Sequence, residues 1–170
     1  MLLFILIKTY KCYTINGDNM IKVLFVCHGN ICRSTMAEFV FKQCIKLLNI
    51  EDKFYVESAG TSNEEEGNPV HSGTKKILDK LGIDCSLKRA RQIKKSDYEK
   101  FDYIIGMDRF NKSNLYRFFN GDKDNKISLL LDFTPTPRDI IDPWYYDNFE
   151  ETYDDILYGI KYFLKKLNIQ

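Results

Sequence analysis

The sequence has little of what several protein classes require. Its 170 residues include only two histidines, and the formal net charge is +1. No cysteines and histidines stand at the spacing of a zinc site, and no basic excess indicates a nucleic-acid partner. The apolar run at residues 1–7 is far shorter than the roughly twenty residues that a membrane-spanning helix needs. We therefore expect no zinc site, no nucleic-acid partner and no stable membrane insertion.

The cysteines are odd in number and show no disulfide framework. The five of them follow no even pattern of spacings, and we find no convincing export signal. Disulfide bonds persist in oxidising compartments and are rare in the cytoplasm. We therefore expect free thiols and a cytoplasmic location. The composition, 44% hydrophobic, suits a chain that can bury a substantial core. For the oligomeric state we expect a monomer or a weak dimer.

Two regions are expected along the chain. The second methionine, Met20, closes a stretch that starts apolar and then becomes polar. We assign residues 1–20 to an N-terminal extension of unknown role. It is either inert, or the product of an upstream start, or else a weak membrane anchor, and truncation to Met20 would separate these interpretations. Residues 21–170 are expected to form one domain.

Apolar runs and helical periodicity alternate along this domain. Short β-branched and aromatic runs predict strands at residues 22–26, 54–58, 102–107 and 127–131. Apolar residues at three- and four-residue steps predict helices at residues 34–49, 70–81, 108–119 and from Phe149 onward. Ser96 is expected to cap a short helical turn, and residues 132–148 to form a long loop. This alternation predicts an α/β fold, a four-stranded parallel sheet with helices on both faces, flavodoxin-like or Rossmann-like.

Several polar residues follow the predicted strands. Cys27, the segment 58–60 and Asp108 each stand at the end of a strand, and Asp142 lies in the loop after the last one. Ligands of parallel sheets bind beside the carboxyl ends of the strands. The sequence therefore predicts a site at this edge of the sheet.

The segment VLFVCHGNICRS, residues 23–34, combines a strand end, a thiol and an arginine. Five residues separate Cys27 from Arg33. The helix expected to follow directs free N–H groups at an anion, and such a helix end beside an arginine favours the thiolate form of a cysteine. Arg33 offers a planar fork for two phosphate oxygens, while Gly29 and Asn30 tolerate the left-handed turns that aim N–H groups inward. The alternative is a buried strand-end cysteine beside a solvated arginine.

A thiolate nucleophile also needs an acid for the leaving oxygen. Asp142 precedes Pro143, and a proline keeps the preceding residue extended, which lets its carboxylate project from a loop. Asp-Pro pairs are also common in ordinary turns, so the pair alone decides nothing. Trp144 and Tyr145 follow at once and suit a wall against a flat phenolic substrate, although loop aromatics more often cover the edge of a core.

Together these residues resemble the low-molecular-weight protein tyrosine phosphatase family. The similarity runs from about Ile21 to the C-terminus, in the family's order and spacing. Its motifs are VLFVCHGNICRS with MAE following, SAGTS at 58–62, GNP at 67–69, ARQI at 90–93, FDYI at 101–104, MD at 107–108 and DPWY at 142–145. The resemblance implies the family's fold and its activity, which is hydrolysis of phosphotyrosine in proteins and of small aryl phosphates without a metal or other cofactor.

The resemblance also implies roles for individual residues. Cys27 would attack phosphorus and form a phosphocysteine, Arg33 would hold the phosphoryl group, and Asp142 would act as general acid and then as general base. Phosphate binding is expected from the loop at His28, Gly29, Asn30, Ile31, Cys32 and Ser34, with the Ser34 hydroxyl also assisting the departing thiolate. Supporting roles are expected at Ser58, Asp108, Trp144 and Tyr145.

Three places depart from the family's usual residues. Thr35 stands where proline is usual, at a helix start where the loss of proline should be mild. Lys88 stands where many members have a histidine that helps to order the phosphate loop, which puts that part of the network in doubt. Glu64, Glu65 and Glu66 replace a segment that often carries an aromatic wall residue. We expect this acidic rim to disfavour acidic peptides around phosphotyrosine.

Cys32 allows two roles, and three other functions compete with phosphotyrosine hydrolysis. Cys32 is either a small loop filler or the partner of Cys27 in a reversible, protective disulfide, as in family members with this pair. Related arsenate reductases need two further cysteines, and Cys85 has no partner at suitable spacing. Related arginine phosphatases favour threonine at the position of Ile31, so the isoleucine here indicates aryl phosphates instead. A non-enzymatic phosphate-binding module is the alternative from another class, and it would bind phosphotyrosine without turnover.

Overall fold

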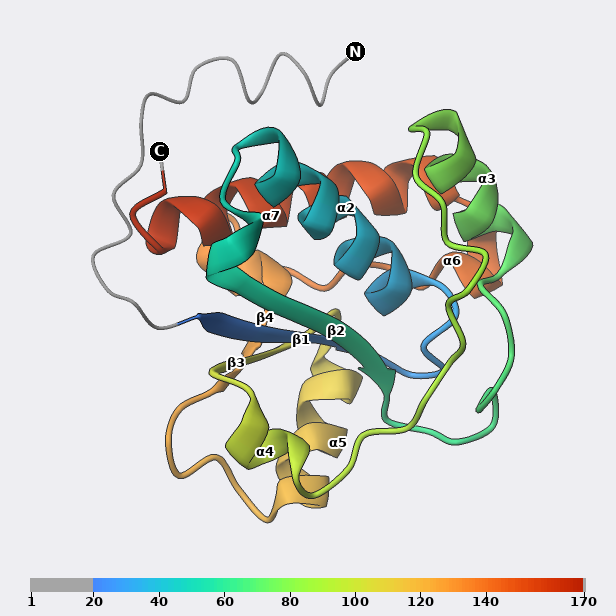
Figure 1. Ribbon diagram of the computed structural model, residues 1–170. Coiled ribbons are helices and arrows are strands. Elements are labelled where there is room, and N and C mark those ends of the chain that lie inside the picture. The colour runs from blue at the N-terminus through green and yellow to red at the C-terminus, as the bar shows by residue number, and fades with distance from the viewer. Residues whose placement is uncertain (1–19, 170) are drawn as a thin grey trace.

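A four-stranded parallel sheet lies at the centre of the computed structural model, which describes residues 20–169 (Figure 1). The expected extension, apart from Met20, lies outside the described residues. The strands are, in spatial order, β2 (Phe54–Gly60), β1 (Ile21–Cys27), β3 (Tyr103–Gly106) and β4 (Ile127–Leu129). Every neighbouring pair is parallel, and Cys27 lies opposite Gly60 in the register. The carboxyl ends of the strands therefore share one edge of the sheet.

The central strand β1 is buried on both faces because its side chains are apolar in both directions. Residues 23–26 are fully buried, as expected for a continuous apolar run inside a parallel sheet. On one face Phe25 packs against Phe41, with ring centroids 5.6 Å apart. On the other face Leu24 belongs to a second core cluster that includes Leu115. The chain thus has a core on each side of the sheet.

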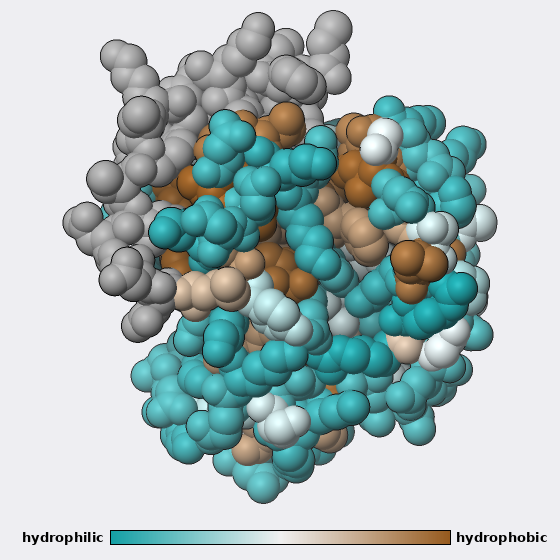
Figure 2. Space-filling model, in the orientation of Figure 1, coloured by the Kyte–Doolittle hydropathy of each residue, from teal (hydrophilic) through white to brown (hydrophobic). Residues whose placement is uncertain are grey.

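Helices cover both of these faces. α2 (Arg33–Leu47), α3 (Ser72–Lys80) and α7 (Phe149–Lys166) lie above the sheet in Figure 1, and α4 (Asp97–Lys100) and α5 (Arg109–Phe119) lie below it. In Figure 2 the surface below the sheet is almost entirely hydrophilic, whereas hydrophobic residues show among the helices above it. Across the described residues, no helix combines the length and the apolar character that a membrane crossing requires. The predicted α/β fold is confirmed.

Three local predictions need correction. The fourth strand ends at Leu129 rather than at residue 131, because the backbone turns there into the 3-10 helix η2 (Leu130–Phe133) and Asp132 Oδ2 accepts the Leu129 N–H at 3.0 Å. A further 3-10 helix, η1 (Glu51–Lys53), precedes β2. Ser96 occupies the position before α4, but its side chain caps nothing. The loop at residues 132–148 contains the short helix α6 (Pro143–Tyr146).

Candidate active site

The loop that connects β1 to α2 lies at the carboxyl edge of the sheet and is fastened to the end of β2. The backbone N–H groups of Thr61 and Ser62 donate to the carbonyl oxygens of Cys27 and His28 at 2.9 and 3.0 Å. Gly60 makes this close approach feasible, because a Cβ at that position would lie 2.6 Å from the His28 oxygen. The shape of the loop therefore depends on a neighbouring strand.

Asn30 ties the loop together from inside. The φ angle of Asn30 is 61°, in the left-handed region that asparagine tolerates. Asn30 is also buried, with 1% of its surface exposed. The side-chain Nδ2 donates to Ser34 Oγ at 2.9 Å and to Ser58 Oγ at 2.8 Å, while Oδ1 accepts from the Arg91 N–H at 3.1 Å. One amide thus joins the loop, β2 and the segment after α3.

The Ser34 hydroxyl lies 3.0 Å from the Cys27 sulfur. Because the Asn30 amide nitrogen can only donate, the Ser34 oxygen acts as the acceptor in that bond, and its own proton is available to the sulfur. This is the arrangement that stabilises a thiolate. Cys27 itself is 3% exposed, so the sulfur meets the solvent only through the cavity above it.

A buried ion pair between Glu38 and Lys88 is joined to this network through Ser58. Ser58 Oγ donates to Glu38 Oε2 at 2.5 Å, and the Lys88 ammonium reaches the same oxygen at 2.8 Å. Glu38 is 4% exposed. Burial alone would raise the pKa of its carboxyl, but Lys88 and Lys42 hold that pKa below its ordinary value. Lys88, whose place in the network was in doubt, is therefore part of it through Glu38.

Sequence reasoning missed three residues of this network. The Thr35 hydroxyl donates to the Asn30 carbonyl oxygen at 2.8 Å, a bond that a proline at this position could not make. Glu38 lies one helical turn beyond Thr35, and both are buried. Polar residues three apart on the buried side of an amphipathic helix were the available signal. Arg91 contributes through its backbone N–H, for which the sequence holds no signal.

The Arg33 guanidinium joins two carboxylates from distant parts of the chain. Its Nη1 lies 2.5 Å from Asp108 Oδ2 and 3.0 Å from the Ile140 carbonyl oxygen, and its Nη2 lies 2.5 Å from Asp142 Oδ2. Arg33 is 2% exposed. Burial by itself would lower its pKa, but the neighbouring Cys27, Asp142 and Asp108 raise it above the ordinary value. Arg33 is therefore a permanent buried cation.

Each of the two carboxylates also begins a helix. Asp108 Oδ1 accepts the Asn111 N–H at 2.7 Å and caps α5, and Asp142 Oδ1 accepts the Trp144 N–H at 3.1 Å and caps α6. An aspartate at this position satisfies a free backbone N–H of the first turn. The local folding of two helices thus aims two carboxylates at one arginine.

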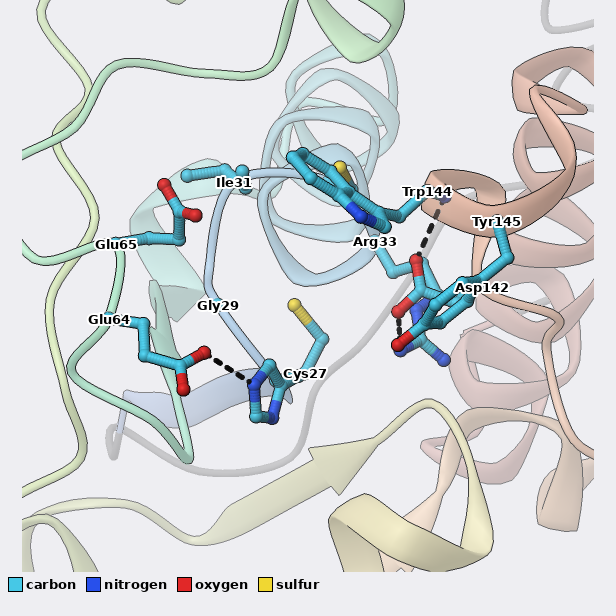
Figure 3. A pocket seen from close by; sticks show the side chains of 11 residues that line it. Cys27, Gly29, Ile31, Arg33, Glu64, Glu65, Asp142, Trp144 and Tyr145 are labelled. Atoms are coloured by element: carbon cyan, nitrogen blue, oxygen red, sulfur yellow. Dashed lines mark hydrogen bonds and ion pairs between the residues drawn. The ribbon is translucent and has the colours of Figure 1, made fainter.

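These groups surround a cavity of about 200 Å³. Figure 3 shows the Cys27 sulfur pointing into its middle, with Glu64 and Glu65 on one side and Asp142 and Tyr145 on the other. The lining residues are Cys27, His28, Gly29, Ile31, Cys32, Arg33, Glu64, Glu65, Asp142, Trp144 and Tyr145. The cavity thus presents a thiol, a cation, a carboxyl group and an aromatic wall.

The structure brings together most of the predicted site residues but changes the acidic rim. Asn30, Ser34 and Ser58 lie beneath the cavity rather than on its surface, and Asp108 meets it through Arg33. Glu64 and Glu65 line the cavity, whereas Glu66 does not. The expectation of a rim made from three glutamates was therefore too broad.

The cysteines of the described chain fall into distinct environments. Cys27, Cys32, Cys44 and Cys85 are all free thiols. Burial and the nearby Cys27 and Asp142 raise the pKa of Cys32, so it is held as a thiol. Burial raises the pKa of Cys44 to about 12. A raised pKa keeps both of these thiols protonated, and a protonated thiol is a poor nucleophile.

Comparison with known proteins agrees with the fold. A family model described as low molecular weight phosphotyrosine protein phosphatase matches residues 22–170. The low molecular weight protein-tyrosine-phosphatase YfkJ of Bacillus subtilis is 40% identical over 150 residues, 87% of this chain and 96% of that relative. The crystal structure of YfkJ superposes with a TM-score of 0.85 at 39% identity, covering 90% of this chain and 97% of that one. The low molecular weight phosphotyrosine protein phosphatase of Gallus gallus is 42% identical over 149 residues, 85% of this chain and 94% of the relative. The chain therefore belongs to the low molecular weight protein tyrosine phosphatase family of enzymes.

Proposed function

We propose that this enzyme hydrolyses phosphotyrosine in proteins, and small aryl phosphates, through a phosphocysteine formed on Cys27. The observation that carries the proposal is the meeting of Cys27, Arg33 and Asp142 around one cavity. A thiolate, a guanidinium fork and a carboxylic acid are the three groups that such a transfer needs.

In the first step the Cys27 sulfur forms a bond to phosphorus while the bond from phosphorus to the tyrosyl oxygen breaks. Arg33 and the backbone N–H groups of residues 28–34 bind the oxygens of the transferring phosphoryl group. Protonated Asp142 gives its proton to the tyrosyl oxygen, which leaves as a phenol. Trp144 and Tyr145 line the cavity and provide the apolar wall for the aromatic ring.

In the second step a water oxygen forms a bond to phosphorus while the sulfur–phosphorus bond breaks. Asp142, now ionised, takes a proton from that water. Cys27 leaves as a thiolate and receives a hydrogen bond from Ser34, whose hydroxyl lies 3.0 Å from the sulfur. Asp108 supports both steps by holding Arg33 in place.

The proposal extends to the setting in which the enzyme works. Its partners are phosphotyrosine-containing proteins, and it acts in the cytoplasm as a monomer or a weak dimer. The free thiols of the described chain support a reducing compartment. Residues 1–20 are proposed to be an extension that catalysis does not need, so truncation to Met20 should leave activity intact.

Hydrolysis of p-nitrophenyl phosphate tests the proposal directly. Wild type should turn over, Cys27→Ser should abolish turnover, and Asp142→Ala should slow it. Cys85→Ser is the matched control, because Cys85 is a buried thiol that does not line the cavity, and this variant should keep wild-type activity. Wild type that binds phosphotyrosine without turnover would instead indicate a binding module.

A further inference from the structure

A second cavity opens beside the catalytic one. It has a volume of about 410 Å³ and shares His28, Arg33, Asp142 and Tyr145 with the catalytic cavity. Its remaining walls come from the first turns of α5 and from residues 139–141, which precede Asp142. Two cavities thus meet along the side of the catalytic acid, and the second is about twice as large as the first.

The carboxylates that line the second cavity are already paired. Asp108 and Asp142 bind Arg33. Asp139 accepts the backbone N–H of Arg109 at 3.1 Å and its Nε at 2.7 Å. Asn111 Oδ1 accepts the Met107 N–H at 3.1 Å. A cationic ligand group would have to compete with Arg33 or Arg109 for these carboxylates.

The second cavity also exposes large apolar side chains to the solvent. Phe110 on α5 is 73% exposed, Ile141 in the following loop is 48% exposed, and Tyr145 on α6 is 76% exposed. All three line the same cavity although they come from three segments. Large apolar side chains gathered at one site mark a binding surface more often than isolated ones do.

We propose that this cavity is a specificity subsite that receives an aliphatic or aromatic side chain of the phosphotyrosine-containing substrate. The inference rests on the proposed function, because the substrate must be a phosphotyrosine peptide whose phosphotyrosine occupies the catalytic cavity. The two cavities share a wall at Asp142 and Tyr145, so one peptide can reach both. In an extended peptide the side chains two residues apart point to the same side. With phosphotyrosine in the catalytic cavity, the residue two positions before or after it faces the second cavity.

Matched phosphotyrosine peptides test the subsite. They differ only by leucine or asparagine, side chains of similar size, placed two residues before or two residues after phosphotyrosine. Wild type should prefer the leucine peptide by roughly tenfold in kcat/KM at one of these positions, because burial of an apolar side chain is favourable. Phe110→Ala should reduce the preference to about twofold or less, and Phe110→Leu should retain most of it.

Two controls accompany this measurement. Hydrolysis of p-nitrophenyl phosphate, which has no flanking residue, should be unchanged in Phe110→Ala. Tyr116→Ala alters another exposed aromatic residue of α5 that does not line the cavity, and this variant should keep the preference for leucine.

The outcomes separate the subsite from the proposed function. Turnover of both peptides at equal rates would overturn the subsite and leave the phosphatase activity standing. A preference that persists in Phe110→Ala would also overturn it. Equal losses on p-nitrophenyl phosphate and on the leucine peptide would assign Phe110 to the catalytic cavity and overturn the subsite. A wild type that turns over no phosphorylated compound would overturn the proposed function itself.

Discussion

Two pairs of carboxylates lie at the site, and they differ in how the chain holds them. Asp108 and Asp142 have side chains that are 14% and 23% exposed, and both contact the buried Arg33 and cap a helix. Glu64 is 71% exposed and pairs with His28, which is itself 55% exposed. Glu65 accepts a hydrogen bond from Asn68 on the same loop.

This difference indicates which carboxylates serve the reaction itself and which influence the choice of substrate. A carboxylate that is fixed by a buried cation and a helix N-terminus can be aimed to within a fraction of an ångström, which proton transfer requires. Carboxylates on a loop that have no buried cation beside them contribute a field that is weak and screened by salt. We therefore expect the aspartates to determine the rate of the reaction and the glutamates to influence only which peptides react.

The largest expected effect is at Asp142. Asp142→Asn keeps an acceptor for the Trp144 N–H but removes the transferable proton. We expect kcat on a phosphotyrosine peptide to fall by roughly 10²–10⁴, and to fall less on p-nitrophenyl phosphate, whose leaving group needs little protonation. Steady-state kinetics on the two substrates measures the difference. Equal losses on both would show that Asp142 is not the acid.

Asp108→Asn should have a smaller effect that does not depend on the leaving group. Asparagine can still cap α5, but the charge that holds Arg33 is lost. We expect kcat/KM to fall by about tenfold on both substrates, the equivalent of one hydrogen bond to a charged group. Asp108→Ala should also lower the free energy of unfolding by about 1 kcal/mol, because the cap is lost as well. If Asp108→Asn lowered kcat/KM only on phosphotyrosine peptides, its effect would depend on the leaving group as that of Asp142 does, and the two aspartates could not be assigned different roles.

A fifth carboxylate, Glu38, extends the comparison to the buried floor of the site. Burial alone would raise its pKa, but Lys88 and Lys42 hold it below the ordinary value in the folded protein. Its contribution to stability is therefore complete above the pKa of an unfolded glutamate, about 4.3, and is lost as the pH falls through the lower folded pKa. Urea unfolding across this range should show wild type losing free energy of unfolding more steeply than Glu38→Gln. As a control, Glu66→Gln should follow the wild-type curve, since Glu66 makes no ion pair among the described residues.

The smallest effect is expected from Glu64 and Glu65. Glu64→Gln with Glu65→Gln should raise kcat/KM for acidic phosphopeptides by about two- to fivefold relative to basic ones, and the gain should shrink at high salt. Glu66→Gln should change little, because Glu66 lies outside the cavity lining. Equal selectivity in all variants at low salt would remove the glutamates from substrate selection.

Much of the fold was predictable because its signals are local. The apolar run before Cys27 and the helical period after Phe149 each specify an element without help from the rest of the chain. Short elements were harder. α6 has only four residues and lies in a proline-containing loop, so its start at Pro143 depends on the cap from Asp142 rather than on periodicity.

The site was predictable where one residue type carries the chemistry, and less so where several residues share it. Cys27, Arg33 and Asp142 were named from the sequence, and the structure places them around one cavity; their catalytic roles stay predictions. The link from Lys88 to Glu38 was not named, because it depends on the reach of a lysine side chain across two elements. The sequence placed Glu66 with Glu64 and Glu65, but only Glu64 and Glu65 line the cavity, and adjacency in sequence does not show which residues of a loop do so.

Gly60 has a consequence for any attempt to move this catalytic loop to another protein. The loop rests against a backbone that has no room for a side chain, since a Cβ on Gly60 would collide with the His28 oxygen. Its inner amide, Asn30, is also held by Ser58 and by the backbone of Arg91. A transplant of residues 27–34 alone would carry Cys27 and Arg33 but not the groups that hold the loop in its shape. A working transplant would need residues 27–34 together with the end of β2. In such a transplant, Gly60→Ala should weaken phosphate binding.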